Sequence, residues 1–376
     1  MTNMMSRNFT SISFIDVDMS TGITLGEGVR SPEDSFLFKR FGAVLSSIIT
    51  LGLFGNLLTI VILSNGRTHK SHNSLTMGLA YSDLMMVLGS QLPSCISAFR
   101  SKWSFFGKYG CTVSAAFGAF SGFSSILIMC FIAYNRYVSV YYPLDSMVNR
   151  YSKTRTAKML GASWVIAAVL AALPFTYNGY TPTALPFCCV LGFANLNWIS
   201  AAVLGNMYVF GFLGPLSSIC WLYVKIFRKI TQTTNELRRS KNHRNKRKTE
   251  IRTAITSLLC VVVFVVCWMP YAVVMVIGHL PIKRLSTDFE PVTIAIAAVF
   301  AKVSAACNPF IYGSLHVKKW SDYKKSLRSH SSSMLRSSHH RSSGRGFASR
   351  DNGRRRSTRP GLNLGAMHHQ GAMVKN

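Results

Sequence analysis

The chain has 376 residues, of which 49% are hydrophobic, and its 42 Lys and Arg residues against 13 Asp and Glu residues give a formal net charge of +29. Soluble domains are rarely this apolar, so the composition argues against a soluble protein and indicates membrane spans. The charge does not indicate a nucleic-acid-binding protein, because it lies on short loops between apolar segments and on a C-terminal tail, where a basic face beside an anionic leaflet explains it.

Residues 1–40 are predicted to form an extracellular N-terminal segment. They contain no uninterrupted apolar core of the kind that a cleavable signal peptide has, so the first apolar segment after them is expected to act as the signal anchor. Asn8 begins an Asn-Phe-Thr acceptor sequence for glycosylation on the extracellular side.

Residues 41–315 contain seven segments that are long and apolar enough to cross a bilayer, which takes about 20 residues in a helix. Because lipid offers the backbone no hydrogen-bond partners, an open chain crosses it as helices. The sequence therefore predicts an all-α membrane protein, a seven-transmembrane helix bundle. The segments are residues 41–65, 74–99, 111–134, 159–175, 198–224, 254–280 and 291–315.

Most Lys and Arg residues follow the first, third, fifth and seventh segments. The positive-inside rule places these stretches in the cytoplasm and the N-terminus outside, as in a multi-pass protein of the plasma membrane. Basic and apolar residues at helical spacing predict a short amphipathic eighth helix, 316–328, on the lipid surface. Residues 329–376 are expected to be a disordered cytoplasmic tail, because Ser, Arg, His and Gly dominate much of this stretch.

Three of the nine cysteines are placed to face the oxidising exterior, namely Cys111, Cys188 and Cys189. A bridge from Cys111 to one of the adjacent pair would hold the second outer loop against the bundle. The other six lie within spans and are interpreted as small core residues.

Polar residues and prolines recur at particular depths in the spans. In their order along seven spans they resemble the motifs of the rhodopsin-like G-protein-coupled receptors, and the resemblance extends over residues 41–328. It implies a receptor rather than an enzyme, with a heterotrimeric G protein as cytoplasmic partner and a receptor kinase and arrestin at Ser-rich stretches such as 331–333. The motif residues are Asn56, Asp83, Trp164, Asn135-Arg136-Tyr137, Pro143-Leu144, Pro215, Tyr223, Cys267-Trp268-Met269-Pro270 and Asn308-Pro309-Phe310-Ile311-Tyr312.

The resemblance assigns a conformational switch to the cytoplasmic half of the bundle. Prolines inside spans free a backbone carbonyl and permit the bend that a switch requires. Asn135 replaces the family's usual acid beside Arg136, so Glu250 is expected to pair with Arg136 at rest; the alternative is an arginine that extends to the membrane edge. The expected switch residues are Asn135, Arg136, Tyr137, Tyr223, Glu250, Asn308, Pro309 and Tyr312.

Asp83 and Lys302 are the two charged residues inside the spans. Asp83 has two interpretations: a protonated carboxyl hydrogen-bonded to Asn56 or Asn308, or a sodium or water site in the switch. Lys302 stands in the apolar run AVFAKVSAACNPFIYG, residues 298–313.

A lysine in this position costs roughly 2.5–3.5 kcal/mol on insertion, which indicates a function. A buried neutral amine is a nucleophile that forms a Schiff base with an aldehyde. The structural alternative is a lysine that binds water or helix carbonyls.

The lysine six residues before Asn308 resembles the retinal-attachment site of opsins. The resemblance implies 11-cis-retinal as cofactor, held among small and aromatic residues. No metal site is expected. The expected cofactor-binding residues are Lys302, Trp268, Tyr271, Gly118, Gly122, Met207, Phe212 and Ala298.

A protonated Schiff base needs a nearby anion, and the two positions where opsins usually carry it are Ser114 and, counting from Cys189 as the disulfide partner of Cys111, Thr183. Three alternatives remain: a neutral Schiff base, a chloride held by hydroxyls of Ser114, Ser94 or Thr183, or Asp83 acting through water. Asn135 and the missing acids suggest an invertebrate, cnidarian-type branch.

The sequence thus predicts a light-activated G-protein-coupled receptor that binds retinal on Lys302. Two alternatives remain. One is a retinal photoisomerase, and the intact cytoplasmic motifs argue against it. The other is a non-photic receptor in which Lys302 pairs with an acidic small-molecule ligand.

Overall fold

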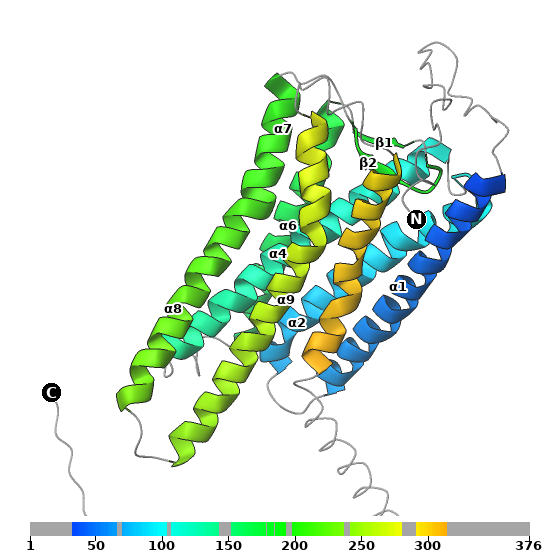
Figure 1. The fold of residues 1–376 in the computed structure, drawn as a ribbon. Helices are drawn as coiled ribbons and strands as arrows, with labels where there is room; N and C mark the ends of the chain where they lie inside the picture. The colour runs from blue at the N-terminus through cyan, green and yellow to red at the C-terminus, as the bar shows by residue number, and fades with distance from the viewer. Residues whose placement is uncertain are drawn as a thin grey trace, which may run out of the picture. The chain divides into compact units, whose positions relative to one another are not determined.

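The computed structural model describes residues 32–65, 70–103, 107–142, 152–177, 179–183, 185–192, 198–236, 241–279 and 291–313, with side chains left out at 33, 65, 70–73, 107–108, 233–236, 241–250 and 279. Asn8, the expected eighth helix 316–328 and the tail 329–376 lie outside these residues. The described part is almost entirely helical, as the sequence predicted (Figure 1).

The elements follow one another along the chain with short connections. Within the described part of the chain, six helices are long and apolar enough to cross a membrane, and they correspond to all the predicted spans except the second. The elements are α1 (Pro32–Asn65), α2 (Lys70–Met86), η1 (Val87–Gln91), α3 (Leu92–Arg100), α4 (Gly107–Tyr141), α6 (Lys153–Ala172), η2 (Leu173–Thr176), β1 (Tyr180–Pro182), β2 (Cys189–Leu191), α7 (Trp198–Tyr208), η3 (Val209–Leu213), α8 (Gly214–Glu236), α9 (Lys241–His279) and a last helix, Pro291–Gly313.

The second and fifth spans each contain a π-helical turn, which the sequence analysis did not anticipate. In the second span η1 joins α2 to α3, and in the fifth η3 joins α7 to α8. Each π turn ends just before a proline, Pro93 or Pro215. Proline cannot donate the usual backbone hydrogen bond and its ring crowds the preceding turn, so the wider turn relieves both problems.

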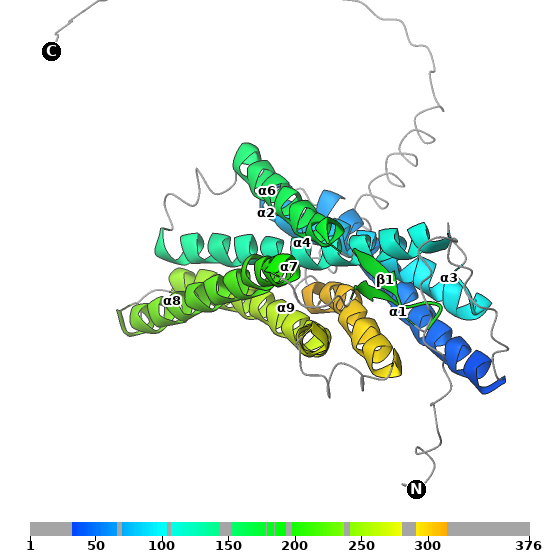
Figure 2. The same ribbon diagram turned by 90° about the horizontal axis from the view of Figure 1, so that it is seen from above.

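Helix α4 occupies the middle of the bundle. It packs against α2, α6, α8 and α9, and Figure 2 shows it running between α2 and α6 on one side and α8 and α9 on the other. Its buried Ile126 and Met129 join Leu222 of α8 and Phe264 of α9 in one apolar cluster. Large apolar side chains such as Phe54 point outward and are exposed, as expected of a lipid-facing surface.

A two-stranded antiparallel hairpin, β1 with β2, lies across one end of the bundle (Figure 1). Its register pairs Tyr180 with Leu191 and Pro182 with Cys189. The disulfide bond between Cys111 at the start of α4 and Cys189 fixes the hairpin to the bundle. The second outer loop therefore forms a roof over the space between the helices.

Candidate functional site

A cavity lies between the helices directly beneath the hairpin. Its wall is mainly apolar and aromatic, with contributions from α2, η1, α3, α4, the hairpin, α7, η3, α9 and the last helix. Of the expected cofactor-binding residues, Lys302, Trp268, Tyr271, Gly118, Met207, Phe212 and Ala298 line it. Hydroxyl-bearing Ser90, Ser94 and Ser114 line it as well, and no carboxylate is among the described residues that form its wall.

Several lining residues were not predicted from the sequence. Tyr208 lies four residues before the predicted Phe212, so helical spacing would have found it, whereas Phe123 lies three or four residues from no predicted position. Tyr180, Cys189 and Leu191 come from the hairpin. Only the folding of the loop over the bundle brings them to the wall, and no periodicity in the sequence signals that.

Lys302 occupies the wall formed by the last helix, beside Ala298 and Ala301. Its main-chain carbonyl accepts a hydrogen bond of 2.9 Å from Nε2 of Gln91. Gln91 is fully buried in η1, and its Oε1 has no hydrogen-bond partner within the described structure. This glutamine, which the sequence analysis did not single out, ties the second span to the seventh at the level of the lysine.

Trp268 of α9 lines the cavity. Its indole Nε1 donates a 3.1 Å hydrogen bond to Oγ of Ser304, and its ring stacks on Phe264 with centroids 5.5 Å apart. Gly122 of α4 does not line the cavity but packs directly against the indole, so a Cβ at this position would collide with the Trp268 ring. The glycine therefore sets the position of the tryptophan.

Replacing Gly122 with alanine is expected to lower the free energy of unfolding by about 1–3 kcal/mol, the usual cost of overpacking. Gly161 of α6 is the matched control, because a Cβ added there meets nothing within 4 Å. Gly161→Ala should be neutral or stabilising by up to about 1 kcal/mol, through helix propensity. Thermal unfolding of both apo variants measures the difference, and equal melting temperatures would contradict the packing role of Gly122.

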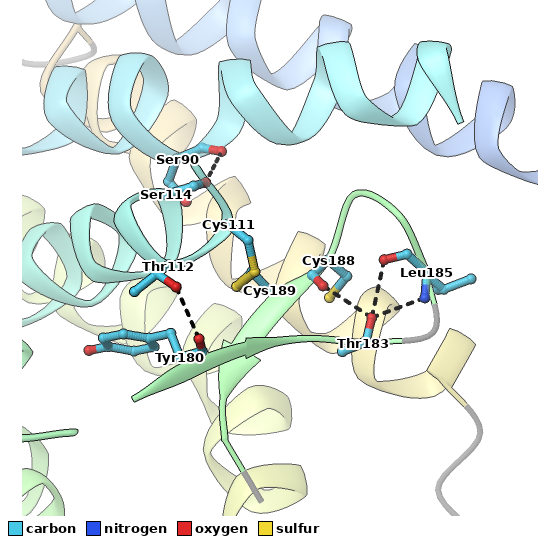
Figure 3. Close-up of a disulfide and its surroundings, with 9 residues drawn as sticks. All are labelled: Ser90, Cys111, Thr112, Ser114, Tyr180, Thr183, Leu185, Cys188 and Cys189. Carbon is cyan, nitrogen blue, oxygen red and sulfur yellow. Dashed lines mark hydrogen bonds between the residues drawn. A yellow bond between two sulfur atoms is a disulfide. The ribbon is translucent and has the colours of Figure 1, made fainter. Parts of the chain in front are cut away.

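The hairpin is held over the cavity by several polar contacts, and Figure 3 draws the one between Thr112 and Tyr180. Thr112 of α4 donates a 3.2 Å hydrogen bond to the carbonyl of Tyr180, whose own hydroxyl donates to the carbonyl of Ala171 at 2.9 Å. With the disulfide bond, these contacts fix β1 and β2 to α4 and α6. The roof is part of the folded structure rather than a loose loop.

The expected counterion residues have different positions. Ser94 and Ser114 line the cavity, but the Ser114 hydroxyl donates its hydrogen to the Ser90 carbonyl at 3.1 Å. Thr183 is not part of the wall; its hydroxyl donates to the Cys188 carbonyl at 3.1 Å and accepts from the Leu185 amide at 3.2 Å. Thr183 therefore shapes the turn of the hairpin.

Asp83 belongs to a separate polar cluster that does not line the cavity. Its carboxylate oxygens accept hydrogen bonds from Asn308 Nδ2 at 2.9 Å and from Ser125 Oγ at 3.3 Å. Asn56, the other expected partner, donates instead to the Ala305 carbonyl at 2.9 Å. The cluster links the second, third and seventh spans.

Asp83→Ala is expected to destabilise the protein by about 2 kcal/mol or more, because each buried donor left without an acceptor costs about 1–3 kcal/mol. Asp83→Asn keeps an acceptor oxygen for Asn308 and should cost less. Thermal unfolding in lipid nanodiscs compares the two. An equal loss of stability in both variants would show that the carboxylate charge, not hydrogen-bond acceptance, is what the cluster needs.

The expected switch residues lie at the other end of the bundle. Tyr137 packs on Tyr141 with ring centroids 4.5 Å apart, and Tyr223 of α8 is buried in the central apolar cluster. The carbonyl of Asn135 accepts a bond from Ser139. Glu250 lies in α9, but its side chain is among those the structure leaves out, so the expected pairing with Arg136 stays a prediction.

The last helix completes this region. Pro309 packs closely against Gly55 of α1, and Tyr312 is buried in the central apolar cluster. Asn308, next to the proline, is the residue that reaches Asp83. Pro309 and the polar cluster are therefore adjacent.

Comparison with known proteins gives consistent matches. Residues 55–312 match the family model described as 7 transmembrane receptor (rhodopsin family). The chain is 30% identical to melanopsin of Rattus norvegicus over 299 residues, 77% of this chain and 61% of the relative, and 31% identical to melanopsin-A of Danio rerio over 288 residues, 74% and 48% respectively. It therefore spans about half to three-fifths of the length of these curated relatives.

Among solved structures, squid rhodopsin superposes with a TM-score of 0.68 at 24% identity, covering 78% of this chain and 86% of that one. At that identity the superposition bears on the fold alone. The expected invertebrate branch stays a prediction.

Proposed function

The chain belongs to the rhodopsin family of seven-transmembrane receptors, and on that premise we propose that it is a light-activated receptor that binds 11-cis-retinal through a Schiff base on Lys302. The observation that carries the proposal is a lysine on the wall of an apolar, aromatic cavity under a fixed roof. Small residues, Gly118 and Ala298 among them, leave room for a long apolar ligand, so the residues present fit retinal.

The residues of the cavity have distinct tasks in this proposal. Lys302 would hold the cofactor, because an amine can condense with an aldehyde with loss of water and so supply a covalent anchor. Retinal, when bound, supplies light absorption and a change of shape. Trp268 bears on the ligand from one end, and the hairpin excludes bulk water from the other.

A path for transmission to the cytoplasmic side follows from the contacts. Trp268 is hydrogen-bonded to Ser304 on the last helix, and one turn further Asn308 is bonded to Asp83. A displaced indole would therefore disturb the last helix near Pro309, where a bend is cheap. We propose that this releases Arg136 for contact with a heterotrimeric G protein.

Receptor kinase and arrestin are proposed partners of the Ser-rich tail, with the N-terminus outside the plasma membrane. For the anion beside the Schiff base we retain three alternatives: a neutral linkage, a chloride near Ser94 and Ser114, or Asp83 through water. The separate cluster that holds Asp83 makes the third the weakest. Removal of halide at fixed pH tests the second, since an unchanged absorption maximum would rule it out.

The experiment is an absorption spectrum of the purified protein regenerated with 11-cis-retinal, followed by light-dependent nucleotide exchange on a G protein. A retinal-dependent band with light-dependent exchange is the expected result. A band without exchange would favour the retinal photoisomerase. No band would overturn the photoreceptor and favour a receptor for an acidic ligand bound by Lys302.

A further inference from the structure

Gln91 is the last residue of the π turn η1, and its side chain reaches across to the last helix. The side chain is fully buried, and its Nε2 donates a 2.9 Å hydrogen bond to the main-chain carbonyl of Lys302. In an α-helix this carbonyl also accepts the N–H of the residue four positions on, here Ala306. Gln91 is therefore a second donor to a carbonyl that the helix itself can satisfy.

Stability of the fold alone is a poor explanation for this glutamine. Among the described residues, none pairs with Oε1 of its amide, which is buried. A buried acceptor without a partner costs free energy, which offsets part of what the Nε2 hydrogen bond contributes. The contact with Lys302 therefore calls for another explanation.

A second amide bound to the last helix has a simpler origin. Nδ2 of Asn56 in α1 donates a hydrogen bond to the carbonyl of Ala305, also at 2.9 Å. The usual helical donor to that carbonyl would be residue 309, which is a proline and has no N–H. Asn56 thus replaces a donor that the helix lacks, whereas Gln91 adds one at the lysine.

The last helix packs on its neighbours mainly through small side chains. Gly52 of α1 shows how closely the helices approach, because a Cβ there would lie 3.0 Å from the Val87 side chain and 3.8 Å from the Ala306 Cα. Methyl groups form low ridges that interlock little, so hydrogen bonds from neighbouring helices must fix the rotation of such a helix. The buried alanines of this helix are Ala295, Ala297, Ala298, Ala301, Ala305 and Ala306.

We propose that Gln91 is a positioning residue for Lys302. By holding the main chain at residue 302 it fixes the rotation of the last helix, and with it the direction in which the amine enters the cavity. Gln91 is not part of the cavity wall, so it acts through the backbone of the lysine and not on the ligand. The inference rests on the proposed aldehyde linkage and names a residue that this linkage needs.

The proposal has a selective consequence. A long aldehyde fills the cavity in few orientations, so its carbonyl carbon meets the amine only when the amine is held in the matching position. A short aldehyde takes many orientations and tolerates a displaced amine. A displacement of about 1 Å can slow a reaction between positioned groups by about a hundredfold. Loss of Gln91 should therefore slow the reaction with the long aldehyde and spare the short one.

The test uses the full-length protein without retinal, in lipid nanodiscs, with farnesal as the long apolar aldehyde and propanal as the short one. Adducts are trapped with cyanoborohydride, and peptide mass spectrometry gives the ratio of the two rate constants at Lys302. Lys225 of α8, outside the cavity wall, is the internal standard for partitioning of the probes. We expect Gln91→Met to lower the standardised farnesal-to-propanal ratio at Lys302 by about tenfold or more.

Asn56→Met is the matched control, because it removes a hydrogen bond of equal length from the same helix, one turn beyond the lysine. It should leave the ratio unchanged. Gln91→Asn keeps the amide but shortens its reach, so it should lower the ratio as Gln91→Met does, and it decides the question if Gln91→Met does not fold. A parental ratio in both Gln91 variants, or an equal fall in Asn56→Met, would overturn the positioning role.

The positioning role and the retinal linkage fail in different ways. A ratio that depends on Gln91, without any retinal-dependent absorption band, would overturn the retinal linkage and keep the positioning role. A retinal-dependent band with a ratio that does not depend on Gln91 would do the reverse. Absence of any adduct at Lys302 in the parent would overturn both.

Discussion

Lys302→Ala is expected to abolish the retinal-dependent absorption band completely while leaving the protein folded. Lys302 is the one amine among the described residues of the cavity wall, so its loss removes the nucleophile rather than weakening it. The hydrogen bond from Gln91 reaches the main-chain carbonyl of residue 302 and survives the substitution. Loss of a lysine from the span also removes an insertion cost of roughly 2.5–3.5 kcal/mol.

The matched control is a lysine outside the cavity. Lys225 of α8 lies over the Trp221 ring, 5.6 Å from its centroid, and does not line the cavity. Lys225→Ala should regenerate with the same band as the parent. Absorption spectra and the mass of the borohydride-reduced adduct are measured for both variants. A band that persists in Lys302→Ala would place the linkage elsewhere and contradict the proposal.

The position of Lys302 in the cavity wall could be predicted, because it depends on helical periodicity within a span. Ala298 follows from the same argument, because residues three or four apart share a helix face, whereas Trp268 was expected from the resemblance to opsins. Gln91 could not be found in this way. It is a polar residue whose role depends on the π turn η1, and that turn shifts the register of the second span relative to a regular helix.

The second span was predicted as one helix of residues 74–99, whereas the structure divides it into α2, η1 and α3. Pro93 was the available signal, since a proline within a helix needs a local change of hydrogen bonding. The sequence analysis used Pro270 and Pro309 as hinges but did not apply the same reasoning to Pro93. The proline alone does not distinguish a π turn from a kink, and in the structure the change is the π turn η1, which packs against α4.

The roof was the least predictable part of the site. Sequence reasoning left the partner of Cys111 open between two adjacent cysteines until the resemblance favoured Cys189, and the structure has Cys189 in the bond. Which of two neighbouring residues faces α4 is set by the register of the hairpin, where Cys189 pairs with Pro182. Adjacent residues on a strand point to opposite sides, so the same register turns Cys188 away from the bond.

Because the Cys111–Cys189 bond holds the hairpin against α4, we expect Cys111→Ala to release the hairpin from its folded position. The disulfide joins residues 78 positions apart, and its constraint on the unfolded chain is worth about 4–5 kcal/mol in the chain-entropy model. The unfolded chain keeps fewer conformations in a membrane than in water, so the disulfide removes less conformational entropy from it. We therefore expect the measured free energy of unfolding to fall by about 2–3 kcal/mol. The melting temperature and the yield of retinal binding should both fall.

Cys189→Ala should be milder than Cys111→Ala, because Cys188 remains beside the vacated position and can form a bond with Cys111 after a local shift. Mass spectrometry of peptides under non-reducing conditions identifies that bond, and the double variant Cys188→Ala with Cys189→Ala should match Cys111→Ala. If the two single variants are equally destabilised and no new bond forms, the hairpin is too rigid to change register.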